Sequence, residues 1–170
     1  MIRMATRADL PAVLEIYNEA ILNTTAVYTY RPYTLANREA WLDKKTLMGI
    51  PVLIFEQDGN VAGFATYGPF RESAAYQYTA EHSIYVHKDY RRLHIGAQLM
   101  EALKNVLNEK GYMTLIGAID ADNDGSCRMH EAMGFQLVGK IERAGYKFGH
   151  WLTLNLYQCQ LKGPDKPKEE

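Results

Sequence analysis

The stretch from Ile84 to Lys110 constrains the fold most, because a buried-strand pattern passes through a basic turn into an amphipathic helix. The apolar residues after the turn recur at helical spacing and predict a helix over about residues 96–110. At a helix start, unpaired N–H groups and the positive end of the helix dipole favour an anion, and Arg91 and Arg92 add positive charge. The segment therefore predicts a pyrophosphate site, although an ordinary connection with solvated arginines fits it equally well.

A second helix start is predicted downstream, where Asp122–Ser126 is rich in side chains that cap helix N-termini. Gly134 closes this short helix, and Phe135 begins another strand. The order of a strand, an Arg-x-x-His-x-Gly turn, a helix and a later Asn-x-x-Ser motif resembles the GNAT superfamily of N-acetyltransferases, which bind acetyl-coenzyme A.

Two further blocks, Thr79–Val86 and Ala144–Trp151, are similar to the phosphinothricin and methionine sulfoximine acetyltransferase branch of that superfamily. The resemblance covers about residues 1–161. It implies an α/β chain with the single-domain acyl-CoA N-acyltransferase fold, in which a mixed, mostly antiparallel sheet has splayed central strands and flanking helices. It also implies acetyl-CoA as co-substrate, and a homodimer in which the second block lies near the partner chain.

One residue departs from the family pattern, because His94 stands where the family has the first glycine of the turn. Glycine permits close backbone approach and positive φ, whereas histidine carries a Cβ and a ring. Because of this departure, a noncatalytic coenzyme A sensor is the alternative to an enzyme.

Length and composition favour one domain that handles small molecules. The chain has 170 residues, of which 47% are hydrophobic, enough for a sizeable core. The formal net charge of −1 provides no basic field for nucleic acid or an anionic membrane. We expect one N-acetyltransferase domain over residues 1–161 and a disordered polar tail over residues 162–170.

The cysteines and the N-terminus predict the cellular setting. Cys127 and Cys159 form no metal-type pair, so free thiols in a reducing compartment are expected. Residues 1–6 lack the apolar run of a signal peptide, and no stretch approaches the ~18 apolar residues of a membrane span. We therefore expect a cytoplasmic protein.

Hydrophobic periodicity predicts the other elements. A helical stripe follows Asp9-Leu10-Pro11, and Asp58-Gly59 marks a hairpin. The remaining expected segments are a weak helix over residues 39–47 and strands over residues 52–56, 61–67, 76–86, 113–119, 135–143 and 151–161.

Amide formation from a thioester requires a neutral amine, a donor for the developing oxyanion and a proton source for the leaving thiolate. Glu81 is the candidate base, because a charged residue in a central strand seldom serves packing alone. Strand alternation places Glu81 on one face with Tyr85 and sends His82 to the other. A structural role is the alternative for Glu81.

The resemblance implies a set of coenzyme contacts. Backbone groups of Tyr85, Val86 and His87 would pair with the pantetheine arm, and the Val86 amide would bind the thioester oxygen. Asn123 and Ser126 match coenzyme-contacting positions, although both are equally typical helix caps. The turn residues matched to the pyrophosphate site are Arg91, Arg92, Leu93, His94, Ile95 and Gly96.

His130 falls where many family members carry a tyrosine that protonates the departing thiolate. The reference pKa of histidine, about 6.5, suits an acid–base role, and a surface histidine on a short helix is the alternative. The spacings of His82, His87 and His94 fit no compact ligand motif, so no metal is expected.

Acceptor recognition is predicted for residues that precede or begin the catalytic strand. Arg71 offers a guanidinium fork for a substrate carboxylate, or it is a solvated loop arginine. In the resembled branch, aromatic residues surround the substrate, which implies that role for Tyr28, Tyr76 and Tyr78. Tyrosines at alternating strand positions are also typical half-buried sheet residues.

We therefore expect an acetyl-CoA-dependent N-acetyltransferase whose acceptor is the α-amine of a small amino acid or analogue, such as phosphinothricin, methionine sulfoximine or methionine sulfone. The amine would attack the thioester directly. The alternatives are an acetyltransferase for protein N-termini or polyamines, and the coenzyme A sensor. A peptide or polyamine calls for an acidic groove, and only Glu72 and Glu81 are acidic near the expected pocket. Nucleic acid and membrane partners are not expected.

Overall fold

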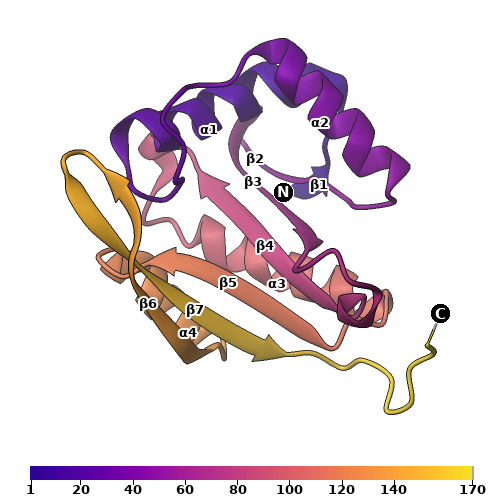
Figure 1. Cartoon of the computed structure of the whole chain (residues 1–170). Helices are drawn as coiled ribbons and strands as arrows, with labels where there is room; N and C mark the ends of the chain where they lie inside the picture. The colour runs from indigo at the N-terminus through magenta and orange to yellow at the C-terminus, as the bar shows by residue number, and fades with distance from the viewer. Residues whose placement is uncertain (170) are drawn as a thin grey trace. The chain divides into compact units, whose positions relative to one another are not determined.

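A computed structural model describes residues 1–169, which Figure 1 traces from indigo to yellow. The helices and strands in chain order are β1 Ile2–Met4, α1 Leu10–Asn23, α2 Leu35–Leu47, β2 Leu53–Gln57, β3 Asn60–Pro69, β4 Thr79–Val86, α3 Ile95–Glu109, β5 Thr114–Asp120, α4 Asp124–Ala132, β6 Gln136–Lys147 and β7 His150–Gln160. Short 3₁₀ turns cover Arg7–Asp9, Ala74–Tyr76 and Lys88–Tyr90. The chain forms two compact units, one of residues 1–67 and 83–103, the other of residues 68–82 and those from 104 onward.

The strands follow the order β1-β2-β3-β4-β5-β7-β6. Strand β4 contributes to both units. In the second unit, the beginning of β4 pairs with β5 in parallel. In the first unit, the amide of His87, just past the end of β4, donates to the Ala62 carbonyl of β3 at 2.9 Å. The pairs β1–β2, β2–β3, β5–β7 and β6–β7 are antiparallel. The predicted mixed, mostly antiparallel sheet with flanking helices is thereby confirmed.

The core of the first unit joins α1 and α2 to its strands (Figure 1). The buried cluster at its centre consists of Val13, Ile16, Val52, Ile54 and Phe64. Helix α1 has Pro11 in its first turn, where the missing N–H leaves no helical bond unmade. Helix α2 begins at Leu35, earlier than predicted, because Thr34 and Asn37 form a capping box.

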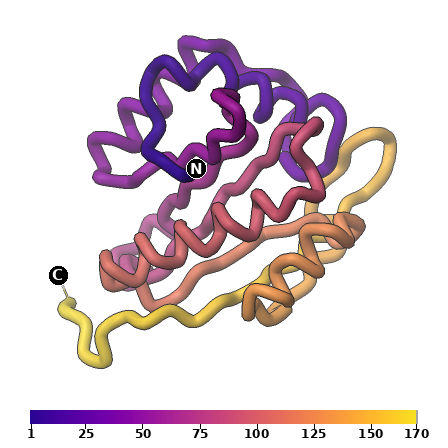
Figure 2. The backbone as a smooth tube through the Cα atoms, turned by 180° about the vertical axis from the view of Figure 1, so that it is seen from behind, coloured from indigo at the N-terminus to yellow at the C-terminus, as the bar shows by residue number. Residues whose placement is uncertain are grey.

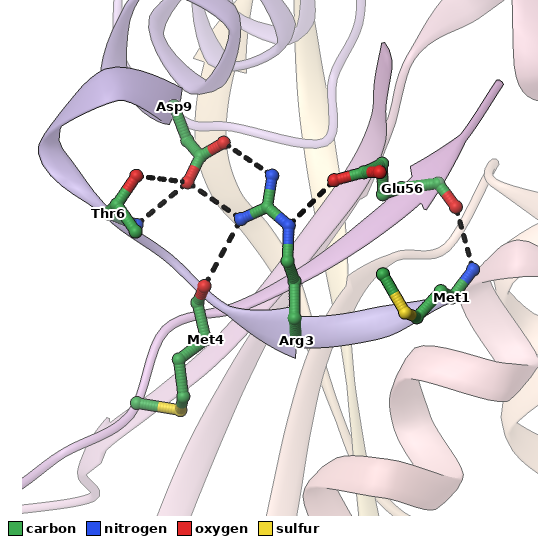
Figure 3. Close-up of polar contacts among 6 residues, drawn as sticks. All are labelled: Met1, Arg3, Met4, Thr6, Asp9 and Glu56. Atoms are coloured by element: carbon green, nitrogen blue, oxygen red, sulfur yellow. Dashed lines mark hydrogen bonds and ion pairs between the residues drawn. The ribbon is translucent and has the colours of Figure 1, made fainter. Parts of the chain in front are cut away.

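The short strand β1 is held by an arginine that the sequence did not identify. Arg3 donates to both carboxylate oxygens of Asp9, at 2.8 and 2.9 Å, and to Glu56 Oε2 at 2.7 Å (Figure 3). The hydrogen bonds from Arg3 lower the pKa of Asp9 to about 2. This arrangement, the Arg3 clamp, ties β1 to β2 and to the start of α1.

In the second unit, β6 and β7 form a long antiparallel ribbon, orange to yellow in Figure 1. Helix α4 lies on the face of this unit that Figure 2 presents, and the Tyr157 hydroxyl of β7 donates to Glu131 of α4 at 3.1 Å. Cys127 and Cys159 are free thiols, as predicted.

The sequence-based boundaries of β4 and of the C-terminal segment need comment. Strand β4 begins at Thr79 instead of Tyr76, because Ala74–Tyr76 forms a 3₁₀ turn. The Tyr78 hydroxyl donates to the carbonyl of Lys168 at 3.1 Å, and Glu170 of the predicted tail lies outside the described residues. The division into a domain over 1–161 and a disordered tail over 162–170 stays a prediction. Among the described residues, no helix is long and apolar enough to cross a membrane.

Candidate active site

The basic turn of the first unit ends where α3 begins. Gln98 donates its amide N–H to the His94 carbonyl at 3.1 Å, so His94 is the residue that precedes the helix. The N–H groups of Ile95, Gly96 and Ala97 therefore have no partner within the helix. Such a helix start fits the pyrophosphate of coenzyme A, because its amides and dipole both favour negative charge.

The backbone of this turn adopts the conformation that glycine allows. His94 has a φ of +56° and Arg92 a φ of +65°, both in the left-handed region. An L-residue other than glycine pays roughly 1–2 kcal/mol there, because its Cβ approaches the following carbonyl oxygen. His94 thus differs from the family's glycine in its side chain while keeping a positive φ.

Arg91, the first basic residue of the turn, is held by an acidic residue of α1. Its Nη2 lies 2.6 Å from Oε2 of Glu19, and the Arg91 side chain is 46% exposed. A guanidinium carries five N–H donors, so this ion pair leaves donors for a phosphate. Arg92 and Leu93 are exposed at the same turn.

At the end of β4, the backbone of His87 is already paired. Its N–H donates to Ala62, and its carbonyl accepts from Tyr90 at 3.0 Å. Successive N–H groups of a strand point to opposite sides, so the Val86 N–H points away from β3. The Tyr85 ring packs against Tyr17, with ring centroids 5.1 Å apart.

In the second unit, Glu81 and Arg71 interact electrostatically. Burial raises the pKa of Glu81, and the Arg71 charge lowers it by less. The Arg71 guanidinium lies over the Phe70 ring at 4.8 Å, and Tyr76 meets the same ring edge-on at 5.7 Å. Phe70 therefore brings together two of the predicted acceptor-binding residues. Tyr28 belongs to the first unit and is 37% exposed.

His130 is buried, so the interpretation of a surface histidine is wrong. Only 1% of the residue is exposed, its Nδ1 lies 2.7 Å from the Ser126 carbonyl oxygen, and its Nε2 lies 2.9 Å from Nε2 of His82. The two rings stack with centroids 4.9 Å apart. Burial lowers the pKa of both rings, that of His82 to about 3.

Gly117 of β5 makes room for this histidine pair. A Cβ at Gly117 would lie 2.7 Å from His82 Nε2 and 3.1 Å from His130, so any larger residue would displace the rings. The ladder between β4 and β5 joins Thr79–Glu81 to Thr114–Ile116, and His82 and Gly117 come next in their strands. The sequence predicted that His82 lies on the strand face that Glu81 does not occupy. It did not predict the partner of His82, which is His130 of α4, 48 residues away.

The other predicted coenzyme residues form the start of α4. The Asn123 side-chain oxygen accepts from the Ser126 amide at 3.1 Å, which is the geometry of a helix cap. The structural interpretation of this pair is therefore confirmed, and a coenzyme contact stays a prediction. Within residues 1–169, no cluster of three or more His, Cys, Asp or Glu side chains is suited to hold a metal ion.

The strand order and the helix that follows the basic turn agree with the class of protein that comparison with known proteins shows. The chain belongs to the acetyltransferase (GNAT) family, whose sequence profile matches residues 11–135. It is similar to the L-methionine sulfoximine/L-methionine sulfone acetyltransferase of Pseudomonas aeruginosa, with 40% identity over 161 residues that cover 94% of each chain.

Solved structures agree with this assignment. An N-acetyltransferase from Staphylococcus aureus superposes with a TM-score of 0.94 at 48% identity, covering 95% of this chain and 98% of that one. A phosphinothricin acetyltransferase from Sinorhizobium meliloti in complex with acetyl-CoA has a TM-score of 0.94 at 31% identity, covering 100% of this chain and 93% of that one. This protein is therefore an acetyltransferase with acetyl-CoA as its co-substrate.

Proposed function

We propose that this protein transfers the acetyl group of acetyl-CoA to the α-amine of a small amino acid or analogue, such as methionine sulfoximine, methionine sulfone or phosphinothricin. One observation carries the proposal: the similarity to the Pseudomonas enzyme extends over 94% of both chains, so it supports a shared acceptor class as well as a shared co-substrate. The relative bound to acetyl-CoA is named for phosphinothricin, an amino acid analogue of the same class.

The proposal assigns chemical roles to three groups. Glu81, whose pKa is raised by burial, removes a proton from the substrate ammonium and so produces the amine that attacks the thioester. The Val86 N–H, which points away from β3, donates to the oxyanion as it forms. His130 supplies the proton that the leaving thiolate requires, which is the role of the family's tyrosine.

Binding roles are assigned by charge and position. The amides at the start of α3 and Arg91 hold the pyrophosphate, with Asn123 and Ser126 as further coenzyme contacts. Arg71 pairs with the carboxylate of the amino acid, while Tyr28, Tyr76 and Tyr78 contact its side chain. The amine is the group that reacts, so the α-carboxylate is the other polar group that all acceptors of this class share.

A homodimer in the cytoplasm is part of the proposal. The β6–β7 hairpin exposes large apolar side chains, among them Phe148 at 56% and Trp151 at 59%, and the Trp151 ring lies 5.2 Å from that of Tyr146. Exposed apolar patches often mark protein–protein interfaces. The free thiols of Cys127 and Cys159 agree with a reducing compartment.

A screen of acceptors tests the proposal by thiol release from acetyl-CoA. Methionine sulfoximine and phosphinothricin should give kcat/KM values far above those for peptides, polyamines or aminoglycosides, and the decarboxylated amine of each acceptor should be poor. Higher kcat/KM for peptides or polyamines would favour the acceptor class named as the alternative. Binding of acetyl-CoA without thiol release for any amine would identify a sensor and overturn the proposal.

A further inference from the structure

Helix α1 is firmly packed where it passes the end of β4 (Figure 1). The Tyr17 ring of α1 meets the Tyr85 ring of β4 edge-on, with centroids 5.1 Å apart. Ile16 and Ala20 of the same helix are buried in the core of the first unit. Buried side chains on a helix fix the backbone between them. Glu19, which lies between these contacts in the chain, therefore projects from a fixed position.

The ion pair between Glu19 and Arg91 is shielded on one side. Oε2 of Glu19 lies 2.6 Å from Nη2 of Arg91, and the Glu19 side chain is only 20% exposed. In the pair of Arg7 with Asp43, by contrast, both side chains are more than half exposed. Solvent weakens a covered pair less than an exposed one. Glu19 and Arg91 both belong to the first unit, so this contact depends on that unit alone.

This contact restrains the guanidinium of Arg91 without occupying all of its donors. The ion pair engages Nη2, whereas a guanidinium carries five N–H donors in a rigid plane. A long side chain that is already held loses less conformational freedom when an anion binds to it than a free one does. The ion pair therefore prepares Arg91 for a second, anionic partner.

The same contact ties a strained backbone to α1. Arg92 and His94, which follow Arg91 in the turn, have φ values of +65° and +56°. Residues other than glycine keep such angles only where the surrounding structure holds them. At the other end of the segment, the His87 amide donates to the Ala62 carbonyl. The ion pair of Arg91 therefore restrains the part of the turn that leads to the free amides of α3.

We propose that Glu19 is a positioning residue of the coenzyme site, which holds Arg91 and the turn in the conformation that binds the pyrophosphate of acetyl-CoA. The inference rests on the proposed function, in which Arg91 and the amides at the start of α3 hold that group, and it adds a residue of α1. Glu19 acts through Arg91, because its own carboxylate repels an anion. Hydrogen bonds that Arg91 makes directly to a phosphate outweigh the solvent-screened repulsion from a carboxylate farther away.

Calorimetry with coenzyme A and the full-length protein, without any acceptor, tests the inference. Glu19→Ala should raise Kd by about 2–10-fold, which is the effect of freeing one long side chain. Glu19→Gln should raise it less, because the amide oxygen still accepts from Arg91. Glu15→Ala is the matched control: Glu15 lies one turn earlier on α1, is 72% exposed and contacts His87 at 3.8 Å. This control should leave Kd unchanged. An unchanged or lower Kd in Glu19→Ala would overturn the inference.

A double-mutant cycle shows whether Glu19 acts through Arg91. Arg91→Ala should raise Kd by about 10-fold or more, because it removes charged hydrogen bonds to the phosphates. Adding Glu19→Ala to that variant should cause no further loss of affinity. The same loss in both backgrounds would mean that Glu19 acts independently of Arg91, and the inference would be wrong. Urea denaturation checks that each variant is folded, and Glu19→Gln carries the test if Glu19→Ala is not.

Fragments of the coenzyme locate the effect and separate it from the proposed function. The loss in Glu19→Ala should persist with 3′-dephospho-coenzyme A, which keeps the pyrophosphate, and vanish with pantetheine, which lacks it. An equal loss with pantetheine would refute a role at the pyrophosphate. Failure of every acceptor in the screen would refute the proposed function but leave the coupling of Glu19 with Arg91 measurable. Acetylation of amino acids without that coupling would refute this inference alone.

Discussion

At the scale of single residues, His94 holds a side chain where the backbone requires a positive φ. We predict that His94→Gly raises the free energy of unfolding by up to about 1 kcal/mol, because it removes roughly 1–2 kcal/mol of strain and loses part of that gain to the flexibility of glycine in the unfolded chain. Urea denaturation measures the change. His94→Ala is the matched control, since it keeps the Cβ and should gain nothing; a glycine variant less stable than the alanine variant would contradict the strain.

Glu81 is the second residue whose environment makes a measurable prediction. Because burial raises its pKa, Glu81 is poised to accept a proton closer to neutral pH than an exposed glutamate. Glu81→Gln should lower kcat by about 10²–10⁴-fold near pH 7 and recover part of it at higher pH, where more acceptor is already neutral. Glu72→Gln, a change at an exposed glutamate close by in the chain, should leave the pH profile unaltered. A wild-type profile for Glu81→Gln would assign Glu81 a structural role.

Among the secondary-structure elements, strand β1 is held at the edge of the sheet by the Arg3 clamp. The folded pKa of Asp9, about 2, lies below its unfolded value of 3.8. Its contribution, about 2 kcal/mol, is therefore complete above pH 4 and is lost as the pH falls through 2. Arg3→Met should lower the free energy of unfolding by roughly 2–3 kcal/mol at neutral pH, because it leaves the buried Asp9 charge unpaired.

The pH dependence distinguishes the clamp from a general loss of packing. The difference between Arg3→Met and wild type should shrink below pH 3, where Asp9 is protonated in the variant. Arg7→Met removes a comparable ion pair, Arg7 with Asp43 at 2.5 Å, but those side chains are 63% and 59% exposed. This control should change stability by less than about 1 kcal/mol. Equal losses in the two variants would argue against the clamp.

At the scale of the whole molecule, the exposed ribbon predicts the oligomeric state. If the apolar side chains of β6 and β7 are covered by a second copy of the chain, a charge at their centre opposes association. Trp151→Glu should convert a dimer into a monomer in sedimentation equilibrium, without loss of secondary structure. Leu47→Glu, at a leucine that is 88% exposed at the end of α2, should leave the dimer intact. A wild-type monomer would refute the homodimer.

Features that arise from neighbours along the chain could be predicted from the residues. Helix α3 was predicted over 96–110 and spans Ile95–Glu109, and the hairpin at Asp58-Gly59 and the cap at Asn123 lie where the residues indicated. A helix face, a tight turn and a cap each depend on residues a few positions apart, so periodicity and capping side chains suffice to predict them. The family resemblance, carried by such local motifs, was correct for the same reason.

Contacts between residues that are distant in sequence could not be predicted and are known from the folded structure. His82 and His130 are 48 residues apart, and Arg3 and Glu56 are 53 apart, so no local pattern announces either contact. Folding buries both histidines and lowers their pKa values, so His130, which was expected to act alone, is half of a neutral pair. Nδ1 of His82 has no hydrogen-bond partner within residues 1–169. Tautomers and pKa values depend on the atoms within a few ångströms, and folding alone brings those atoms together.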